Sequence, residues 1–289
     1  MSRDRPSGKG RGPGRKPSQS HKDRSAAPAR PSGPRPPRRS DRGGGGERFG
    51  PDRDGFVIGL HAALALLRHE PERIRGVHCW SRDGKTLEAL RNAGCTDWET
   101  EPPFGLGEDH LAQGVALAIR PYRHLELDAL LERVPAQAGR VLLLLDSITD
   151  TRNVGAILRS AAFFGVDGAI VPRDRAAGVS PVAERIARGG ASVVPVAQVT
   201  NLAQTIVQLQ QAGWFCIGTA LQPGAVSLWD CRTDRPIALV LGAEDRGIRP
   251  LVARRCDQLA VLPAAGDMQS LNVASFATAA LAILRRPRS

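Results

Sequence analysis

The stretch VLLLLDSITDTRNVGAILRSAAFFG, residues 141–165, decides the fold of this chain. Its first five residues are all apolar, which predicts a strand buried on both faces, and the periodicity of residues 153–165 predicts a helix. A strand, a short polar turn and a helix in this order are typical of nucleotide-phosphate sites. Neither of the glycine patterns that let backbone amides cradle phosphate is present, however. The turn leads instead to Asn153 and, six residues later, Arg159.

The same pattern continues to the end of the chain. Continuous apolar runs, as opposed to alternating ones, indicate a parallel sheet covered by helices on both faces. Residues 140–289 are therefore predicted to form an α/β domain. The expected strands are 141–146, 169–172, 193–199, 214–220, 237–242 and 259–263, and the expected helices are 153–165, 181–189, 201–212, 250–256 and 270–286.

Three segments precede this domain. Residues 55–122 alternate short strands with helices, which predicts a small α/β domain, and residues 123–139 are expected to be a linker with one helix. Residues 1–54 consist mainly of Pro, Gly, Ser and Arg. Such a composition buries too little apolar surface to offset the entropy of ordering, so we expect a disordered basic tail.

The positive charge of the chain is concentrated in that tail. Residues 1–50 hold 14 Lys and Arg against 4 Asp and Glu, whereas the other 239 residues hold 26 against 25. An Arg-rich excess of one sign favours RNA or DNA as a partner, through phosphate contacts and the release of counterions. A solubility tail without a dedicated partner is the alternative.

Several classes of protein and of site are improbable for this sequence. It has no apolar stretch long enough for a membrane span, no signal-peptide core and no C-x-x-C among its five cysteines, so we expect a cytoplasmic protein without disulfides or structural zinc. All six histidines lie before Arg140. The larger domain therefore has no His general base or His-ligated metal, and no metal site is predicted. Its chemistry must depend on positioning, hydrogen bonds and charge.

Polar residues and glycines follow three of the expected strands, at the sheet edge where ligands of such folds bind. Each has a structural explanation on its own, because the polar side chains could cap helices and the glycines could permit tight turns. Three such turns at one end of one sheet favour a binding site instead. In chain order they carry Asn153 and Arg159, then Gly242, Glu244 and Gly247, then Ser270, Leu271 and Asn272.

These turns resemble the three signature motifs of the SpoU (TrmH) family of RNA 2′-O-ribose methyltransferases, of the SPOUT class. The motifs read NVGAILRSAAFFG (153–165), IALVLGAEDRGI (237–248) and LPAAGDMQSLNVASFATA (262–279). GLHAALALL (59–67) and AQGVALAIRP (112–121) resemble the family's small ribosomal-protein-like RNA-binding domain. Within the family, the chain is most similar to the bacterial enzymes that methylate a guanosine of 23S ribosomal RNA.

The resemblance implies a parallel sheet whose C-terminal segment is threaded into a deep trefoil knot that binds S-adenosylmethionine. It also implies a homodimer whose active site draws residues from both subunits. The residues expected to contact the cofactor are Gly242, Leu262 and Leu271, with neighbouring backbone at Leu241, Ala243, Pro263 and Ala264.

The same resemblance implies catalytic roles. Asn153 and Arg159 match residues of the first motif that face the methyl acceptor, Glu244 matches the acidic residue of the second, and Ser270 and Asn272 match the polar pair of the third. Because S-adenosylmethionine carries no phosphate, the first turn needs no phosphate-binding glycines. The reaction would be an in-line attack of a ribose 2′-OH on the sulfonium methyl. Arg159 stays protonated, so we expect it to bind an RNA phosphate and stabilise alkoxide character, with Glu244 holding Arg159 or a neighbouring polar group.

Other functions remain open at this point. A tRNA 2′-O-methyltransferase of the same family would carry the same short motifs. A non-catalytic RNA-binding protein or ribosome assembly factor would have no reason to retain all five polar residues. A Rossmann methyltransferase or dehydrogenase would want the glycine-rich first turn that this sequence lacks.

Overall fold

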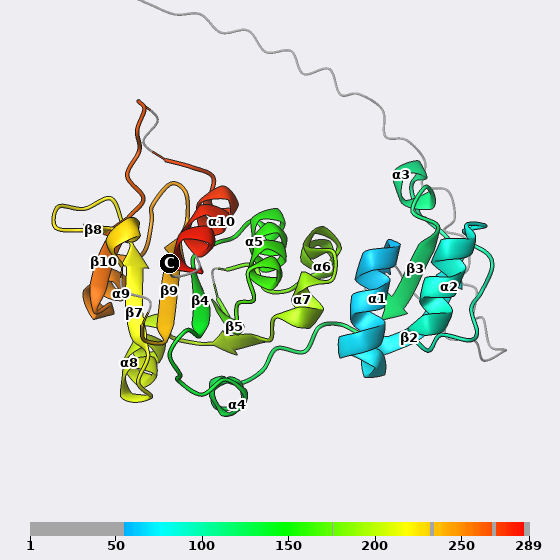
Figure 1. The fold of residues 1–289 in the computed structure, drawn as a ribbon, viewed down its shortest axis with the longest axis horizontal. Helices are drawn as coiled ribbons and strands as arrows, with labels where there is room; N and C mark the ends of the chain where they lie inside the picture. The colour runs from blue at the N-terminus through cyan, green and yellow to red at the C-terminus, as the bar shows by residue number, and fades with distance from the viewer. Residues whose placement is uncertain (1–54, 175, 232–233, 268–269, 286–289) are drawn as a thin grey trace, which may run out of the picture. The chain divides into compact units, whose positions relative to one another are not determined.

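The computed structural model describes residues 55–174, 176–231, 234–267 and 270–285 (Figure 1). The expected basic tail, residues 1–54, lies outside these residues. The described residues belong to one compact unit, residues 48–289, which contains two β-sheets.

The smaller sheet is built from the first part of the described chain. Its elements are β1 (Gly55–Ile58), α1 (Leu60–His69), η1 (Pro71–Arg73), β2 (Ile74–Cys79), α2 (Gly84–Asn92), α3 (Glu108–Leu111) and β3 (Val115–Ile119). The strands are antiparallel in the order β1-β3-β2. All five residues of the central strand β3 are buried, as its uninterrupted apolar sequence predicts. Ala63, Leu66 and Leu90 of the two longer helices pack in the same apolar cluster.

The larger sheet has seven strands that pair in parallel, in the order β6-β5-β4-β9-β7-β10-β8. The strands are β4 (Val141–Asp146), β5 (Gly168–Pro172), β6 (Val196–Val199), β7 (Phe215–Thr219), β8 (Val226–Ser227), β9 (Ile237–Gly242) and β10 (Gln258–Val261). The predicted α/β class with a parallel sheet is confirmed. Asp146 at the end of β4 pairs in register with Gly242 at the end of β9, which brings the first two polar turns side by side.

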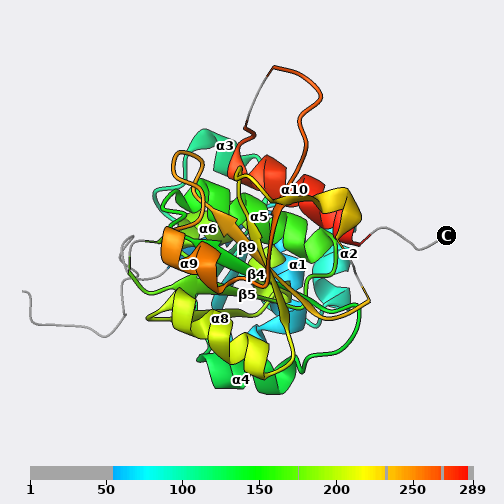
Figure 2. The same cartoon turned by 90° about the vertical axis from the view of Figure 1, so that its left-hand side faces the viewer.

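Helices cover both faces of this sheet. They are α4 (Leu127–Arg133), α5 (Thr151–Phe163), α6 (Pro181–Ala187), α7 (Gly190–Val193), α8 (Leu202–Gln211), η2 (Leu228–Asp230), α9 (Pro250–Arg255) and α10 (Val273–Leu284). In Figure 2, α5 and α10 lie on one side of β4, β5 and β9, and α4 and α8 lie on the other. Along β4, Leu143 and Leu145 join the core on the α5 side, whereas Leu142 and Leu144 join the core on the α8 side. A strand buried on both faces therefore needs its continuous apolar sequence.

The strand expected at 193–199 begins later than predicted. Val193 ends the short helix α7, and β6 starts only at Val196. At the start of α7 two backbones approach closely, because a Cβ on Gly190 would lie 2.7 Å from the carbonyl oxygen of Leu158 in α5. Local apolar periodicity carries no sign of such a long-range contact. The edge strand β8 was not predicted, because two residues are too few to show a pattern.

A buried ion pair joins η1 to α6 within the compact unit. Arg73 Nη2 lies 2.8 Å from Glu184 Oε1, and Arg73 Nη1 lies 2.7 Å from Glu70 Oε2. Arg73 is 5% and Glu184 3% exposed, and Glu184 Oε2 has no hydrogen-bond partner among the described residues. Burial raises the pKa of Glu184 to about 7, although the charge of Arg73 opposes the shift.

This raised pKa predicts a pH-dependent stability. The folded protein holds the Glu184 proton more tightly than the unfolded chain, so the stabilisation is full below the ordinary pKa of 4.5 and is lost as pH rises through about 7. We expect the free energy of unfolding to fall by up to about 3 kcal/mol across this window. Urea unfolding between pH 4.5 and 8 measures it. Glu184→Gln should flatten the curve, and a variant that retains the wild-type pH dependence would contradict the assignment.

Candidate active site

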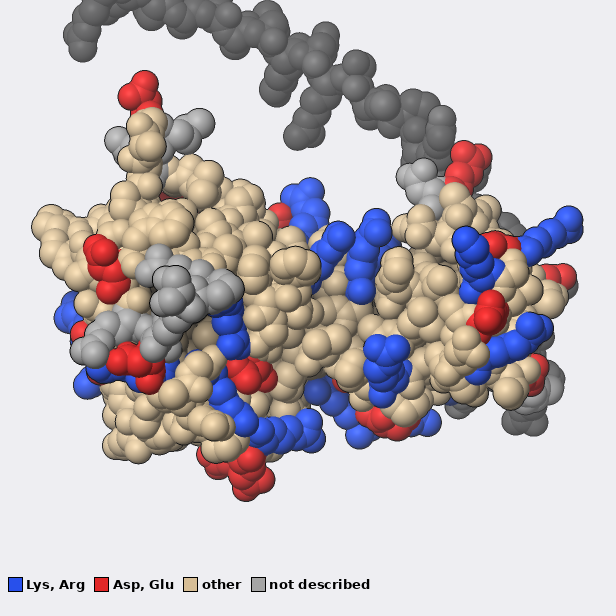
Figure 3. Space-filling model, viewed as in Figure 1, with Lys and Arg blue, Asp and Glu red and all other residues tan. Residues whose placement is uncertain are grey.

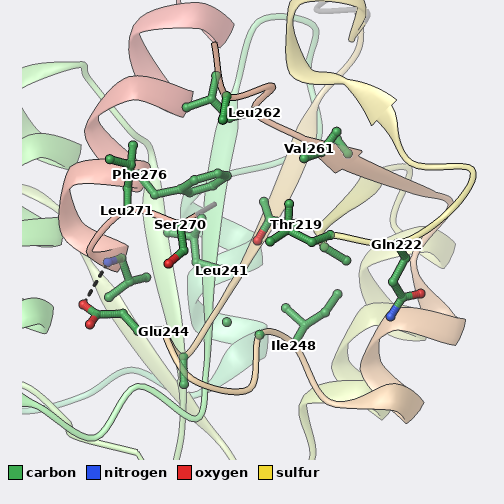
Figure 4. Close-up of a pocket in the computed structure, with 18 of the residues that line it drawn as sticks. Thr219, Gln222, Leu241, Glu244, Ile248, Val261, Leu262, Ser270, Leu271 and Phe276 are labelled. Carbon is green, nitrogen blue, oxygen red and sulfur yellow. Dashed lines mark hydrogen bonds between the residues drawn. The ribbon is translucent and has the colours of Figure 1, made fainter. Parts of the chain in front are cut away.

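A cavity of about 520 Å³ opens beyond the carboxyl ends of β7 and β9, against the segment that leads into α10 (Figure 4). Its volume lies within the range of about 300–1,000 Å³ that is usual for small-molecule sites. Thr219, Ile248, Leu262 and Phe276 point into it from four separate segments (Figure 4). Largely apolar walls with a few polar groups are typical of cofactor sites.

All seven residues expected to contact the cofactor line this single cavity. Their contact with a cofactor stays a prediction, but the structure places them together although they come from two separate motifs. They are Leu241, Gly242, Ala243, Leu262, Pro263, Ala264 and Leu271.

Gly242 allows the floor of the cavity to form, because the loop after β9 turns back against it. A Cβ at this position would lie 2.1 Å from the carbonyl carbon of Gly247 and 2.2 Å from the amide nitrogen of Ile248. Both contacts are with backbone, which cannot rotate away as a flexible side chain can. Gly247 itself has a φ of 63°, a conformation that favours glycine. The two glycines therefore hold the loop in a shape that leaves the cavity open.

Asp146 holds the end of this loop from the neighbouring strand. Its side chain is fully buried, and Arg249 donates to it twice, from the backbone N to Oδ2 at 2.7 Å and from Nε to Oδ1 at 2.7 Å. Ser147, the next residue, has a φ of 61°, which is unusual for a non-glycine residue. Asp146 was not among the predicted site residues, although an Asp after five buried apolar residues is itself a signal, since a buried carboxylate must be paired.

Loss of this carboxylate should destabilise the protein. We expect Asp146→Ala to lower the free energy of unfolding by about 3 kcal/mol, because it leaves Arg249 without its buried partner. Asp245→Ala is the matched control in the same loop: Asp245 forms an exposed ion pair with Arg246 at 3.1 Å, and its loss should cost less than about 1 kcal/mol. Urea unfolding of both variants checks this, and equal effects would contradict the role of Asp146.

Glu244 connects the three polar turns beside the cavity. Its Oε1 accepts hydrogen bonds from Asn153 Nδ2 at 3.4 Å, from the backbone N of Val273 at 3.1 Å (Figure 4) and from Asn272 Nδ2. Asn272 Nδ2 also lies 3.0 Å from Asn153 Oδ1. Three of the five predicted catalytic residues, one from each motif, therefore form one hydrogen-bonded cluster.

Helix capping accounts for only one of these polar residues. Asp150, not Asn153, caps α5, accepting from Arg152 N at 2.8 Å. Asn272, not Ser270, caps α10 through Oδ1, which accepts from Ala274 N at 2.9 Å. The amide of Asn153 and the hydroxyl of Ser270 are thus not used as caps, and Ser270 lines the cavity. Asn153 instead uses one N–H and its oxygen within the cluster, which leaves its second N–H for a substrate.

Arg159 lies apart from the cluster. It is on an exposed part of α5, about 9 Å along the helix axis from Asn153. Its side chain forms no hydrogen bond or ion pair with any residue that the structure describes. Glu244 was expected to hold either Arg159 or a neighbouring polar group. In the structure it holds the neighbouring polar groups Asn153 and Asn272. The guanidinium of Arg159 remains available to an external anion.

The end of β7 is a part of the site that the sequence analysis did not identify. Thr219 and Gln222 line the cavity, and Thr219 Oγ1 donates to the carbonyl of Val240 in β9 at 2.9 Å. A usable signal was present, because ligands of parallel sheets bind beyond the carboxyl ends of strands and β7 is one of them. The sequence after this strand carries no unusual charge, so it did not stand out.

The described residues include no group of three or more His, Cys, Asp or Glu placed to hold a metal ion. Among them, no helix is long and apolar enough to cross a membrane.

Burial raises the pKa of Cys256 to about 12, so this thiol is no activated nucleophile.

Comparison with known proteins places the chain in a family. Residues 140–283 match the model of the SpoU rRNA Methylase family. The chain is 36% identical over 228 residues to the 23S rRNA (guanosine-2'-O-)-methyltransferase RlmB of Pseudomonas putida, a match that covers 75% of this chain and 90% of the relative. The chain belongs to the SpoU family. The family predicted from the three motifs is thereby confirmed.

Further relatives and solved structures are similar to this chain. The enzyme of the same name from Acinetobacter baylyi is 37% identical over 245 residues, covering 78% of this chain and 94% of the relative. Among solved structures, the SpoU methyltransferase AviRb from Streptomyces viridochromogenes superposes with a TM-score of 0.67 at 25% identity, over 80% of this chain and 88% of that one. AviRb has also been solved in complex with the cofactor AdoMet, with a TM-score of 0.65.

Proposed function

We propose that this protein transfers a methyl group from S-adenosylmethionine to the ribose 2′-oxygen of a guanosine in 23S ribosomal RNA. The observation that carries the proposal is that the three SpoU motifs meet in space, one cavity lying beside one cluster of Asn153, Glu244 and Asn272. The substrate follows from relatives named for this reaction, of which the matches cover 90% and 94%. Methylation of ribosomal RNA agrees with the cytoplasmic location expected from the sequence.

The cavity fits the cofactor in size and in chemistry. Leu241, Leu262 and Leu271 offer apolar walls, and the backbone at Ala243 and Pro263 offers hydrogen-bonding groups for an adenine. The missing Cβ of Gly242 keeps the loop close enough to form the floor. When bound there, S-adenosylmethionine supplies a methyl group already activated by its sulfonium, so the protein mainly has to align the acceptor.

The cluster beside the cavity aligns the acceptor in this proposal. Glu244 and Asn272 together fix the amide of Asn153, whose second N–H and second oxygen lone pair orient the ribose hydroxyls. Ser270, at the cavity wall, adds a hydroxyl at the same edge. Arg159 binds the adjacent RNA phosphate with its unpaired guanidinium and stabilises negative charge as the 2′-OH loses its proton.

We also infer that the C-terminal segment forms the trefoil knot expected from the resemblance. In the sequence α10 follows β10, yet it packs against α5, the helix that follows β4. In the sheet, β9 and β7 lie between β4 and β10. Residues 262–266, 270 and 271, which lie between β10 and α10, line the same cavity as the loops that follow β7 and β9. This crossing supports a threaded chain.

A homodimer is the oligomeric state that we propose. Phe163 at the end of α5 is 84% exposed. A second subunit would cover this apolar group and would complete a site in which the Arg159 side chain has no partner among the described residues.

We keep the domain limits expected from the sequence: an RNA-binding domain at 55–122, a linker at 123–139 and the methyltransferase domain at 140–289.

The proposal requires that labelled methyl passes from S-adenosylmethionine to unmodified 23S ribosomal RNA, and that the product is a 2′-O-methylguanosine at one position.

A further inference from the structure

A second cavity, of about 240 Å³, lies between the start of α1 and the end of α6. The polar residues that line it are His61, His110, Gln113, Arg185 and Arg188. The elements around it are in direct contact: a Cβ on Gly189, just after α6, would lie 2.5 Å from the Cβ of Ala65 in α1. The cavity is therefore a feature of packed elements, separate from the one beside β9.

Among the described residues, the side chains of the two arginines of this cavity have no acidic partner. Arg185 and Arg188 are exposed, and neither side chain forms a hydrogen bond or ion pair with a residue in the described part of the chain. The carboxylate nearest in sequence, Glu184, is buried and faces Arg73. Figure 3 shows Lys and Arg side chains gathered over the region of α6. Two unpaired guanidinium groups in one cavity make a site for an anion.

The backbone of Arg188 is a second sign that this residue serves a ligand. It caps the end of α6 with a φ of 48° and a ψ of 45°, the left-handed conformation. Glycine is the usual residue in that conformation, because an L side chain there is strained. An arginine held in a strained conformation at a cavity is more readily explained by binding than by folding.

The start of α1 contributes a third feature. Its N-cap is Gly59, and no side chain caps this end of the ten-residue helix. Gly59, Leu60 and His61 line the cavity, so the first amides of the helix lie at its wall. Helix N-termini without a side-chain cap favour anions. Here such an N-terminus and two arginines line the same cavity, and both features favour a negatively charged ligand.

The cavity lies close to the active-site helix. A Cβ on Gly190 would be 3.0 Å from the Cα of Arg159 and 2.7 Å from the carbonyl oxygen of Leu158. The turn that carries Arg188 therefore packs directly on α5 at Arg159. A chain that places one phosphate at Arg159 can place another, a nucleotide or more away, at Arg188.

We propose that this second cavity binds a backbone phosphodiester of the substrate RNA, through Arg185, Arg188 and the amides at the start of α1. The proposal rests on the proposed function, because it takes RNA to be the substrate. His61, His110 and Gln113 then line the path of the same strand. The cavity fixes how the RNA lies on the protein, and the cluster around Glu244 acts on the ribose.

The test compares two double variants for binding to an unmodified 23S ribosomal RNA transcript. Arg185→Ala/Arg188→Ala should raise Kd about tenfold and lower the slope of log Kd against log salt by about one, as expected for a lost phosphate contact. Arg133→Ala/Arg254→Ala removes the same charge from α4 and α9, whose buried residues pack on the opposite face of the sheet. The control should change neither value appreciably. Equal Kd values and slopes for the two double variants would overturn the proposal.

Two further measurements separate this proposal from folding and from the proposed function. Arg188→Gly removes the guanidinium and suits the left-handed conformation, so its Tm should equal or exceed that of the wild type while RNA binding weakens. In the double variant, the KM for RNA should rise. The kcat at saturating RNA and the affinity for the cofactor should both stay unchanged. If the wild type binds RNA through these arginines but transfers no methyl group, the proposed function fails and the phosphate site stands.

Discussion

Arg159→Ala should lower kcat about a thousandfold while the affinity for S-adenosylmethionine stays unchanged. The side chain is exposed and has no partner among the described residues, so its removal breaks no internal interaction. In the proposed mechanism, what is lost is the charge that holds the RNA phosphate and stabilises the developing alkoxide. Arg159→Lys should recover little, because an ammonium cannot form the bidentate contact of a guanidinium. Single-turnover methyl transfer, with calorimetry for cofactor binding, measures both quantities.

The control for this effect lies on the same helix. Arg152 is exposed and paired with Asp150 at 3.0 Å, and Arg152→Ala should keep turnover within about threefold of the wild type, since exposed pairs contribute little. Near-normal turnover of Arg159→Lys would remove the bidentate contact from the mechanism, and near-normal turnover of Arg159→Ala would remove the residue itself.

Gly242→Ala should raise the Kd for S-adenosylmethionine by more than about a hundredfold, because the added methyl group would overpack the floor of the cavity. The added Cβ would lie 2.1 Å from the carbonyl carbon of Gly247, so the loop 243–248 would have to move away from β9 and distort the cavity floor. Gly266→Ala is the matched control, because Gly266 lines the same cavity and a Cβ there meets nothing within 4 Å. Calorimetric titration of both variants measures the difference, and a change of less than fivefold for Gly242→Ala would show that the loop is not held as described.

The larger sheet could be predicted because its strands are buried on both faces. The run at 141–145 has no polar residue, since β4 contributes to the core on each side of the sheet. The order of the strands could not be predicted from the local sequence pattern. β9 lies between β4 and β7 because it pairs with strands that are far away in the sequence. The later start of β6, which follows the contact of Gly190 with α5, could not be predicted for the same reason.

The candidate site was predictable where a resemblance named its residues and where polar groups stood out against apolar runs. Asn153, Glu244 and Asn272 were expected together, and the structure brings them into one cluster. Asp146 and the end of β7 were not expected, because their importance lies in partners far away in sequence. Asp146 and its partner Arg249 are 103 residues apart. The second cavity likewise depends on α1 packing against the turn after α6.

The central claim is tested most directly by methyl transfer from labelled S-adenosylmethionine to unmodified 23S ribosomal RNA, with unmodified tRNA in parallel. Resistance of the modified linkage to alkaline cleavage locates the product, and Glu244→Gln, which removes the charge that orders the two amides, serves as the inactive comparison. We expect one protected guanosine in the ribosomal RNA and none in tRNA. Transfer to tRNA alone would contradict the proposed substrate, and absence of transfer to either RNA or ribosomal precursor particles would contradict the proposed reaction.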